Sequence, residues 1–214
     1  MTEKVEILTF ASGPLATNAY LIVCLETKKV AIVDPAPQVA ERLIQVIEQR
    51  GFTPTCIILT HTHWDHIADV DPLADHFALP VFVHEEDAYN LISPGSDRIP
   101  SWLEIKPRVP DRLLKEGDSI PIGNTMWQVI HTPGHSPGCI CLYNAEEKLL
   151  LSGDTLFKSS IGNLSFGTSD PARMWPSLKK LAQLPPETKV FPGHGDSTTI
   201  GKESWLDHAE DVFG

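Results

Sequence analysis

Three imidazoles and one carboxylate fall within a single short stretch, Thr60-His61-Thr62-His63-Trp64-Asp65-His66. The apolar run Cys56-Ile57-Ile58-Leu59 precedes it, and this β-branched run, bounded by Pro54 and Thr60, predicts a buried strand. The stretch would then lie in the loop between that strand and a helix that begins near Ile67. Loops at the ends of rigid strands are where catalytic groups are usually placed.

The spacing within this stretch indicates how its side chains are directed. Side chains alternate in extended backbone, so His61, His63 and Asp65 can point one way, and His66 must point elsewhere unless the chain turns there. One stretch could therefore present ligands to two neighbouring metal ions. Histidine is the commonest metal-binding side chain, and a mixed His/Asp set suits zinc or iron better than calcium or magnesium. The sequence thus predicts a metal site rather than a histidine-rich solvated loop.

The composition argues against several classes of protein. The 214 residues carry a net charge of −11, from 28 acidic and 17 basic residues, without a Lys/Arg run. This charge disfavours a nucleic-acid surface and binding to anionic membranes. No apolar stretch approaches the length of a membrane helix, and Met1–Phe10 lacks a signal-peptide core. We therefore expect a cytoplasmic protein that acts on a small molecule, with neither nucleic acid nor membrane as partner; the oligomeric state is left open.

The four cysteines, Cys24, Cys56, Cys139 and Cys141, form no C-x-x-C pair. Cys139 and Cys141 would share one face of a predicted strand, which is only a weak indication of a metal pair. Buried, reduced thiols are the favoured interpretation.

Strand and helix patterns run through the whole chain. Predicted strands cover 5–10, 18–24, 29–34, 56–59, 81–83, 125–131, 139–143, 149–152 and 189–191. Predicted helices cover 39–50 with Gly51 as the stop, about 67–77, 84–92, and a segment capped by Asp170 with Pro171 at its first position. The Pro-containing segment 93–112 is an expected irregular loop that could border a substrate cleft. Without repeats or linkers, residues 1–214 are predicted to form one domain with two β-rich halves.

Three later segments each follow directly on a predicted strand: Thr132-Pro133-Gly134-His135, Gly153-Asp154-Thr155 and Pro192-Gly193-His194. Glycine lets the backbone approach a centre closely, and proline stiffens the approach. A Gly-His pair alone is usually a turn. All three segments together, in a chain that already holds His-x-His-x-Asp-His, predict that His135, Asp154 and His194 converge on the first stretch.

The order HTHWDH, His135, Asp154, His194 resembles the metallo-β-lactamase fold superfamily across essentially the whole chain. Val33-Asp34-Pro35, the run 153–157, and Pro192-Gly193-His194-Gly195 with the run 198–201 look most like the small, single-domain glyoxalase II-like hydrolases. The resemblance implies an α/β protein, a four-layer αββα sandwich with metals at one edge between two sheets.

The resemblance also implies a division of the ligands between two metal ions. The first ion would be held by His61, His63 and His135, the second by Asp65, His66 and His194, and Asp154 would bridge both. Two Zn²⁺ ions are expected, with iron or manganese as alternatives. Two metals about 3.5–4 Å apart can share one water and lower its pKa from about 15.7 towards 7. The implied activity is a thioesterase of the hydroxyacylglutathione hydrolase type that uses a bridging hydroxide, with Asp65 and Asp154 as catalytic residues. A thiolate leaving group needs little protonation, so no separate general acid is required.

Other functions share these residues. A mononuclear-iron persulfide dioxygenase would use His61, His135 and Asp154, and a lactonase would use all seven. A β-lactamase is disfavoured because Asp154 stands where the best-known dizinc type has cysteine. A non-catalytic metal-binding scaffold is a further alternative, which the complete ligand set argues against.

The remaining histidines are given structural roles. His76 and His208 are expected to be exposed helix residues, and His84 and His131 to be structural residues at strand ends. Asp34 is expected to hydrogen-bond the ligand loops.

The substrate is where the sequence departs from the resemblance. Glyoxalase II enzymes add a C-terminal region with basic side chains that hold glutathione, whereas residues 195–214 contain one Lys and no Arg. Asn163 stands where a basic residue is expected, and nothing in the sequence places Lys158 or Arg173 as a substitute. We therefore expect thioester hydrolysis with weak recognition of glutathione.

Overall fold

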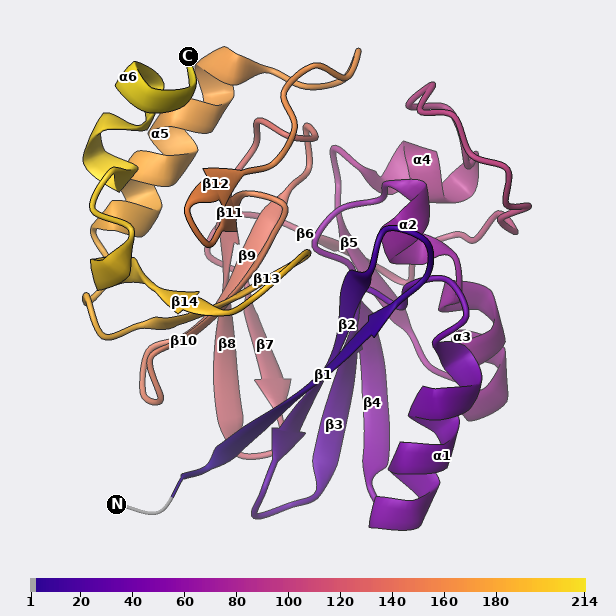
Figure 1. Cartoon of the computed structure of the whole chain (residues 1–214). Helices are drawn as coiled ribbons and strands as arrows, with labels where there is room; N and C mark the ends of the chain where they lie inside the picture. Colours follow the sequence, from indigo (N-terminus) through magenta and orange to yellow (C-terminus); the bar gives the residue numbers. More distant parts are fainter. Residues whose placement is uncertain (1–2) are drawn as a thin grey trace.

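Two mixed sheets, packed face to face, form the centre of the protein (Figure 1). The computed structural model describes residues 3–214. The first sheet holds, in chain order, β1 (Val5–Ser12), β2 (Thr17–Cys24), β3 (Lys29–Val33), β4 (Thr53–Ile58), β5 (Val81–His84) and β6 (Arg112–Leu114). Strands β1 to β3 are antiparallel, and β3 to β6 are parallel.

The second sheet is built from the later part of the chain. Its order is β14 (Thr198–Thr199), β13 (Lys189–Pro192), β10 (Leu149–Gly153), β9 (Ile140–Asn144), β8 (Thr125–His131) and β7 (Ser119–Ile122). A short hairpin of β11 (Leu156–Phe157) and β12 (Ser160–Ile161) follows β10.

Helices cover the outer faces of both sheets, which completes the expected αββα sandwich (Figure 1). On the first sheet lie α1 (Ala40–Arg50), α2 (Trp64–Ile67), α3 (Val70–Phe77) and α4 (Ala88–Ile92). On the second lie α5 (Pro171–Ala182), two 3₁₀ turns (Ile200–Lys202 and Leu206–His208) and α6 (Ala209–Phe213).

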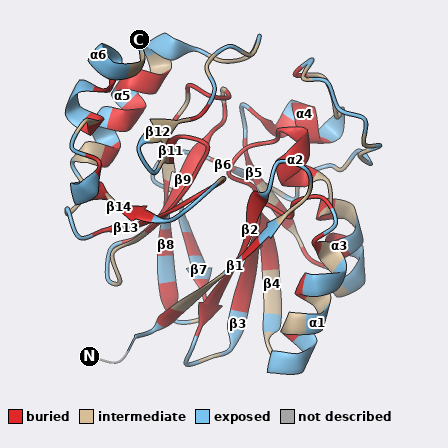
Figure 2. Ribbon diagram, viewed as in Figure 1, coloured by how far each residue is buried: buried red, intermediate tan, exposed pale blue. Residues whose placement is uncertain are grey.

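Strand β2 shows how the layers are held together. Every one of its residues is buried, and alternate side chains enter different cores. Leu21 and Val23 pack under the first helical layer, whereas Tyr20 and Ile22 pack between the sheets with Trp127. Figure 2 shows this burial through the central strands. A strand that is apolar on both faces is typical of a sheet covered on both sides.

The predicted helix signals at two positions are confirmed. Asp170 caps α5 by accepting a hydrogen bond from Ala172 N at 3.0 Å, with Pro171 at the first position. Gly51 ends α1 in the left-handed conformation (φ 62°), which glycine adopts without a steric penalty.

Other boundaries differ from the sequence prediction. The predicted helix over 67–77 is divided into α2 and α3, and the predicted helix over 84–92 begins only at Ala88 because His84 ends β5. The three-residue β6 and the β11–β12 hairpin are too short to give a periodic signal.

The four cysteines are buried and free. Within residues 3–214, no helix combines the length and apolar character that crossing a membrane requires.

Candidate metal centre

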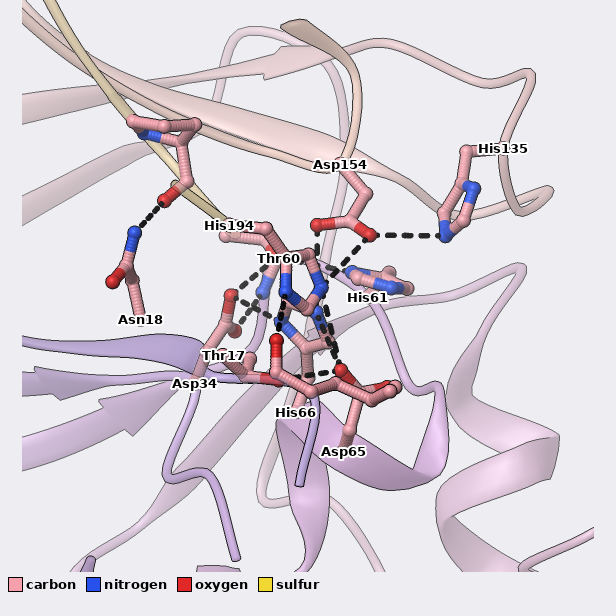
Figure 3. A network of polar contacts seen from close by, with 12 residues as sticks. Thr17, Asn18, Asp34, Thr60, His61, Asp65, His66, His135, Asp154 and His194 are labelled. Atoms are coloured by element: carbon pink, nitrogen blue, oxygen red, sulfur yellow. Dashed lines mark hydrogen bonds and ion pairs between the residues drawn. The ribbon is translucent and has the colours of Figure 1, made fainter. Parts of the chain in front are cut away.

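Four strand exits from the two sheets meet at one edge of the sandwich. The stretch 59–66 follows β4 and runs into α2, His135 lies beyond β8, Asp154 follows β10 directly, and His194 lies just past β13. The structure brings together all seven side chains predicted to bind metal, and Figure 3 shows six of them converging.

A first cluster consists of His61, His63 and His135. Their ring nitrogens lie within 4.8 Å of one another, and all three residues are buried. The rings pack edge to face, with centroids 4.4 to 5.0 Å apart. Among the described residues, the three Nε2 atoms find no hydrogen-bond partner. Three buried, unpartnered nitrogens that face one another are an arrangement that a bound cation would satisfy.

A second cluster consists of Asp65, His66 and His194. Asp65 Oδ2 lies 3.5 Å from His66 Nε2 and 3.4 Å from His194 Nε2. Two imidazoles around a carboxylate form a second set of nitrogen and oxygen donors.

Asp154 lies between the two clusters. Its Oδ2 atom is 3.4 Å from His135 Nε2 of the first cluster and 3.4 Å from His194 Nε2 of the second. Its Oδ1 atom is 3.4 Å from His66 Nε2, and this buried oxygen accepts no hydrogen bond from residues 3–214. One carboxylate therefore reaches both clusters, which is the geometry that a bridging ligand requires.

The chain turns just before Asp65, which is the case in which the alternation of an extended segment does not apply. Helix α2 begins at Trp64, so Asp65 and His66 lie on its first turn and both join the second cluster. The turn of the chain, rather than strand alternation, separates them from His61 and His63.

Comparison with known proteins agrees with this architecture. The sequence profile of the metallo-beta-lactamase superfamily matches residues 12–194. The chain belongs to the metallo-β-lactamase superfamily.

Three known proteins are similar to this one over 83% of the chain or more. The hydroxyacylglutathione hydrolase GloC of Haemophilus influenzae is 34% identical over 182 residues, which cover 83% of this chain and 85% of that protein. The solved structure of the BLEG-1 B3 metallo-beta-lactamase has 37% identity and a TM-score of 0.87, covering 98% of this chain and 100% of that one. TTHA1623, solved in a di-iron-bound form, has 39% identity and a TM-score of 0.82, covering 94% and 98%.

In this metallo-β-lactamase fold, the Nδ1 atoms of three clustered histidines lie within hydrogen-bonding distance of oxygen atoms outside the two clusters. His66 Nδ1 lies 3.0 Å from Asp34 Oδ2, His135 Nδ1 lies 2.8 Å from Asn163 O, and His194 Nδ1 lies 3.2 Å from Leu15 O. In the neutral ring, donation of an N–H to an oxygen on this side selects the tautomer whose Nε2 lone pair faces inward and can bind metal.

Asp34 fulfils the role expected from the sequence. It accepts hydrogen bonds from Thr60 N at 2.7 Å and Thr60 Oγ1 at 2.6 Å, in addition to its contact with His66. The end of β3 is thereby joined to the first metal-binding stretch.

Asp87 and Thr17 contribute to the site without having been predicted. The buried Asp87 carboxylate accepts from Gly138 N (2.6 Å), Ser136 Oγ (2.8 Å) and Thr62 N (3.1 Å). It therefore ties the loop of His63 to the loop of His135. Thr17 Oγ1 donates to Asp65 Oδ2 at 2.6 Å. Burial raises the pKa of the Asp87 carboxyl, against its hydrogen bonds with Ser136 and Gly138.

The charges of the two clusters differ in the metal-free protein. Burial lowers the pKa of His61 well below its ordinary value and lowers that of His63 to about 3. Burial also opposes the charge of His66, but the carboxylates of Asp65, Asp154 and Asp34 hold its pKa well above the ordinary value.

Burial and neighbouring charges also act in opposite directions on the pKa values of Asp65, Asp154 and His194. Burial opposes ionisation of Asp65 and Asp154, yet His66 and His194 lower the pKa of Asp65 to about 2 and that of Asp154 well below its ordinary value. The two carboxylates outweigh burial at His194 and raise its pKa to about 9. The first cluster is thus neutral at His61 and His63, whereas the second is an ionised cluster.

The remaining histidines lie as predicted. His84 and His131 end β5 and β8 and stack on each other, with centroids 3.9 Å apart and planes at 17°. His76 and His208 are exposed.

Proposed function

We propose that this protein is a dinuclear metal-dependent hydrolase that cleaves thioesters, of the hydroxyacylglutathione hydrolase type. The observation that carries the proposal is the position of Asp154, whose two oxygens reach both histidine-containing clusters. The similarity to a hydroxyacylglutathione hydrolase over 85% of that relative's length supports the same reaction class.

The donor set fits two metal ions. The proposed ligands are His61, His63 and His135 for one ion, Asp65, His66 and His194 for the other, and Asp154 for both. Four Nε2 atoms and one Asp154 oxygen are buried without a hydrogen-bond partner in the described part of the chain, and bound cations would satisfy them. Imidazole and carboxylate ligands suit Zn²⁺, which we propose as the resident metal; iron and manganese are the alternatives, and one similar protein was solved with two irons.

When bound, the two ions would supply Lewis acidity towards an acyl oxygen and would lower the pKa of a water molecule. Asp65 would orient that water, and the hydrogen bond that its Oδ2 accepts from Thr17 Oγ1 supports this proposal because it fixes the carboxylate. In the reaction a water oxygen forms a bond to the acyl carbon and the carbon–sulfur bond breaks, with its electron pair leaving on sulfur. Water supplies one oxygen of the carboxylate product and releases its protons to the solvent, and the thiolate leaves without a general acid.

The test is steady-state hydrolysis by metal-loaded protein of a thioester panel and a lactone panel, with oxygen consumption measured on a glutathione persulfide. Thioester cleavage that is lost on chelation and restored by Zn²⁺ is expected. Lactone turnover without thioester turnover would replace the proposal with a lactonase. Oxygen consumption that requires iron would replace it with a persulfide dioxygenase, and inactivity towards all three substrate types with metal bound would support a scaffold.

A further inference from the structure

A cavity of about 350 Å³ opens directly onto the metal-binding residues. His63, Asp65, His135, Asp154 and His194 form its floor. Its walls carry five apolar side chains: Leu15, Trp64, Ile99, Phe157 and Phe166. These come from separate parts of the chain, namely the β1–β2 turn, α2, the 93–111 loop, β11, and the loop before α5. Side chains from so many segments build a shaped apolar wall around the reactive centre.

The described residues that line the cavity include no basic side chain that could select an anionic thiol group. Among the described residues that line it, none is Lys or Arg, and the acidic groups Asp65 and Asp154 face it. Lys158, next to Phe157, pairs instead with Asp196 at 2.9 Å. Arg173 pairs with both oxygens of Glu86, at 2.8 and 3.1 Å.

Two further polar residues lie near the cavity. Asn163 lies on the wall, but its Oδ1 accepts from the backbone N and Oγ of Ser165. Arg98 is exposed beside Ile99 and is not a lining residue. Neither residue supplies a buried charge for a substrate carboxylate.

A second hollow lies beside the 93–111 loop. It measures about 340 Å³ and shares Trp64 and Ile99 with the first cavity. Its lining is mixed, because polar and acidic side chains stand beside the apolar ones: Asn90, Asp97, Ser101 and Glu104 with Ile67, Leu103 and Ile105. Trp102 of the same loop packs on Trp64 with ring centroids 5.3 Å apart, although Trp102 is 72% exposed. The apolar surface available to a substrate is therefore that of the first cavity.

We propose that the pocket receives an uncharged, medium-length acyl chain, so that the substrates are thioesters of apolar acyl groups rather than thioesters selected for an anionic thiol. The chain would lie against Leu15, Ile99 and Phe166 in the cavity at the metal site. The chemical step at the acyl carbon rests on the proposed thioesterase function, whereas the binding preference does not.

The experiment compares acyl chains and thiols independently. The metal-loaded protein is given acetyl, butanoyl, hexanoyl and octanoyl thioesters of N-acetylcysteamine, which is uncharged, and the same acyl groups on glutathione. Each methylene that becomes buried should raise kcat/KM about fourfold until the pocket is filled. We therefore expect a rise of at least about tenfold from acetyl to hexanoyl, and no preference for the glutathione series.

Substitutions of apolar residues that line the cavity test whether the cavity causes the dependence on acyl chain length. Leu15→Ala and Ile99→Ala should flatten the dependence on chain length. The matched control is Leu113→Ala on β6, because Leu113 is 48% exposed and Leu15 is 50% exposed, but Leu113 does not line the cavity. Leu15→Arg should shift selectivity towards the glutathione series by placing a cation at the rim.

Calorimetry separates this inference from the proposed function. The ligands are S-hexyl-N-acetylcysteamine and S-hexylglutathione, thioethers that cannot be hydrolysed. Tighter binding of the uncharged thioether, weakened in Leu15→Ala, would uphold the pocket assignment even if no thioester were cleaved. Hydrolysis that is independent of chain length would overturn it and leave the thioesterase function in place. A preference for the glutathione series of tenfold or more that is lost in Arg98→Ala would also overturn the pocket assignment and leave the thioesterase function in place.

Discussion

The Asp34 carboxylate supports the His66 ring from behind the metal-binding residues, with 3.0 Å between Oδ2 and Nδ1 (Figure 3). The same carboxylate binds the backbone and hydroxyl of Thr60, which precedes His61 in the chain. The end of β3 therefore controls the direction of a side chain in the second cluster and the course of the loop that carries the first.

Replacement of Asp34 should affect the two metal sites unequally. Asp34→Ala removes the partner of His66 Nδ1, and losing such a partner typically costs about 10- to 100-fold in metal affinity. We expect that loss at the second cluster, a smaller loss at the first, and a milder effect in Asp34→Asn, which keeps a hydrogen-bonding group. Competition titration with a chromogenic chelator measures both affinities. Equal weakening of the two sites would contradict the specific role of the His66 contact.

Gly193 should be indispensable because of its closeness to the ligands. A Cβ at this position would lie 2.0 Å from Asp154 Oδ1 and 2.8 Å from His66 Cε1. Gly193→Ala should therefore displace Asp154 and reduce metal content at both sites. The matched control is Gly167→Ala, where an added Cβ meets nothing within 4 Å. Metal content of the two variants is measured by plasma emission, with circular dichroism to verify folding. Full metal content in Gly193→Ala would contradict the predicted displacement of Asp154.

Metal binding should release protons mainly from the second cluster. His66 has a raised pKa and His194 a pKa of about 9, so both rings are positively charged, with a proton on each nitrogen, at pH 7 in the metal-free protein. His61 and His63, whose pKa values are lowered, are already neutral. Because only neutral imidazole binds metal, roughly two protons should leave as the second cluster fills at pH 7. Its affinity should rise as the pH increases to about 9.

Calorimetric titration in buffers of different ionisation enthalpy counts these protons. A heat of binding that does not vary between buffers would show that the two histidines are not protonated beforehand. His194→Ala should remove about one of the released protons.

Asp65→Asn should reduce turnover more than substrate binding. Asn keeps the size of the side chain and can still accept from Thr17 Oγ1, but it loses the charge that orients the attacking water. A loss of about 10²-fold in kcat is expected, with a much smaller change in KM, because misplacing a reacting group by about 1 Å can cost that much. The comparison is made at matched metal content. A kcat within about threefold of wild type would exclude this role, because lost orientation should cost far more.

The residues that meet at the edge of the sandwich could be predicted to converge because each lies at or just beyond the end of a strongly apolar strand. The four-layer sandwich itself was implied by the resemblance to the metallo-β-lactamase superfamily, since strand and helix patterns alone indicated only one domain with two β-rich halves. Asp34 could also be anticipated, since it ends a strand in the same way.

Other features depended on contacts between distant segments. Asp87 lies in a segment with a helical pattern, where an Asp is ordinarily exposed, yet it joins loops around residues 62 and 136. The sequence left open whether the chain turns near Asp65, because the stretch 60–66 is too short for periodicity to reveal that α2 begins at Trp64. The packing of Trp102 on Trp64 likewise leaves no local signal.

The most direct test of a dinuclear thioester hydrolase is a titration of metal-free protein with Zn²⁺, in which bound metal and hydrolysis of hexanoyl-N-acetylcysteamine are followed together. A dinuclear centre bridged by Asp154 predicts that two ions bind and that hydrolysis rises until the second has bound. Asp154→Ala should bind neither ion tightly, and His194→Ala should retain the first. Full hydrolysis with one equivalent bound, or hydrolysis that survives removal of all metal, would contradict it.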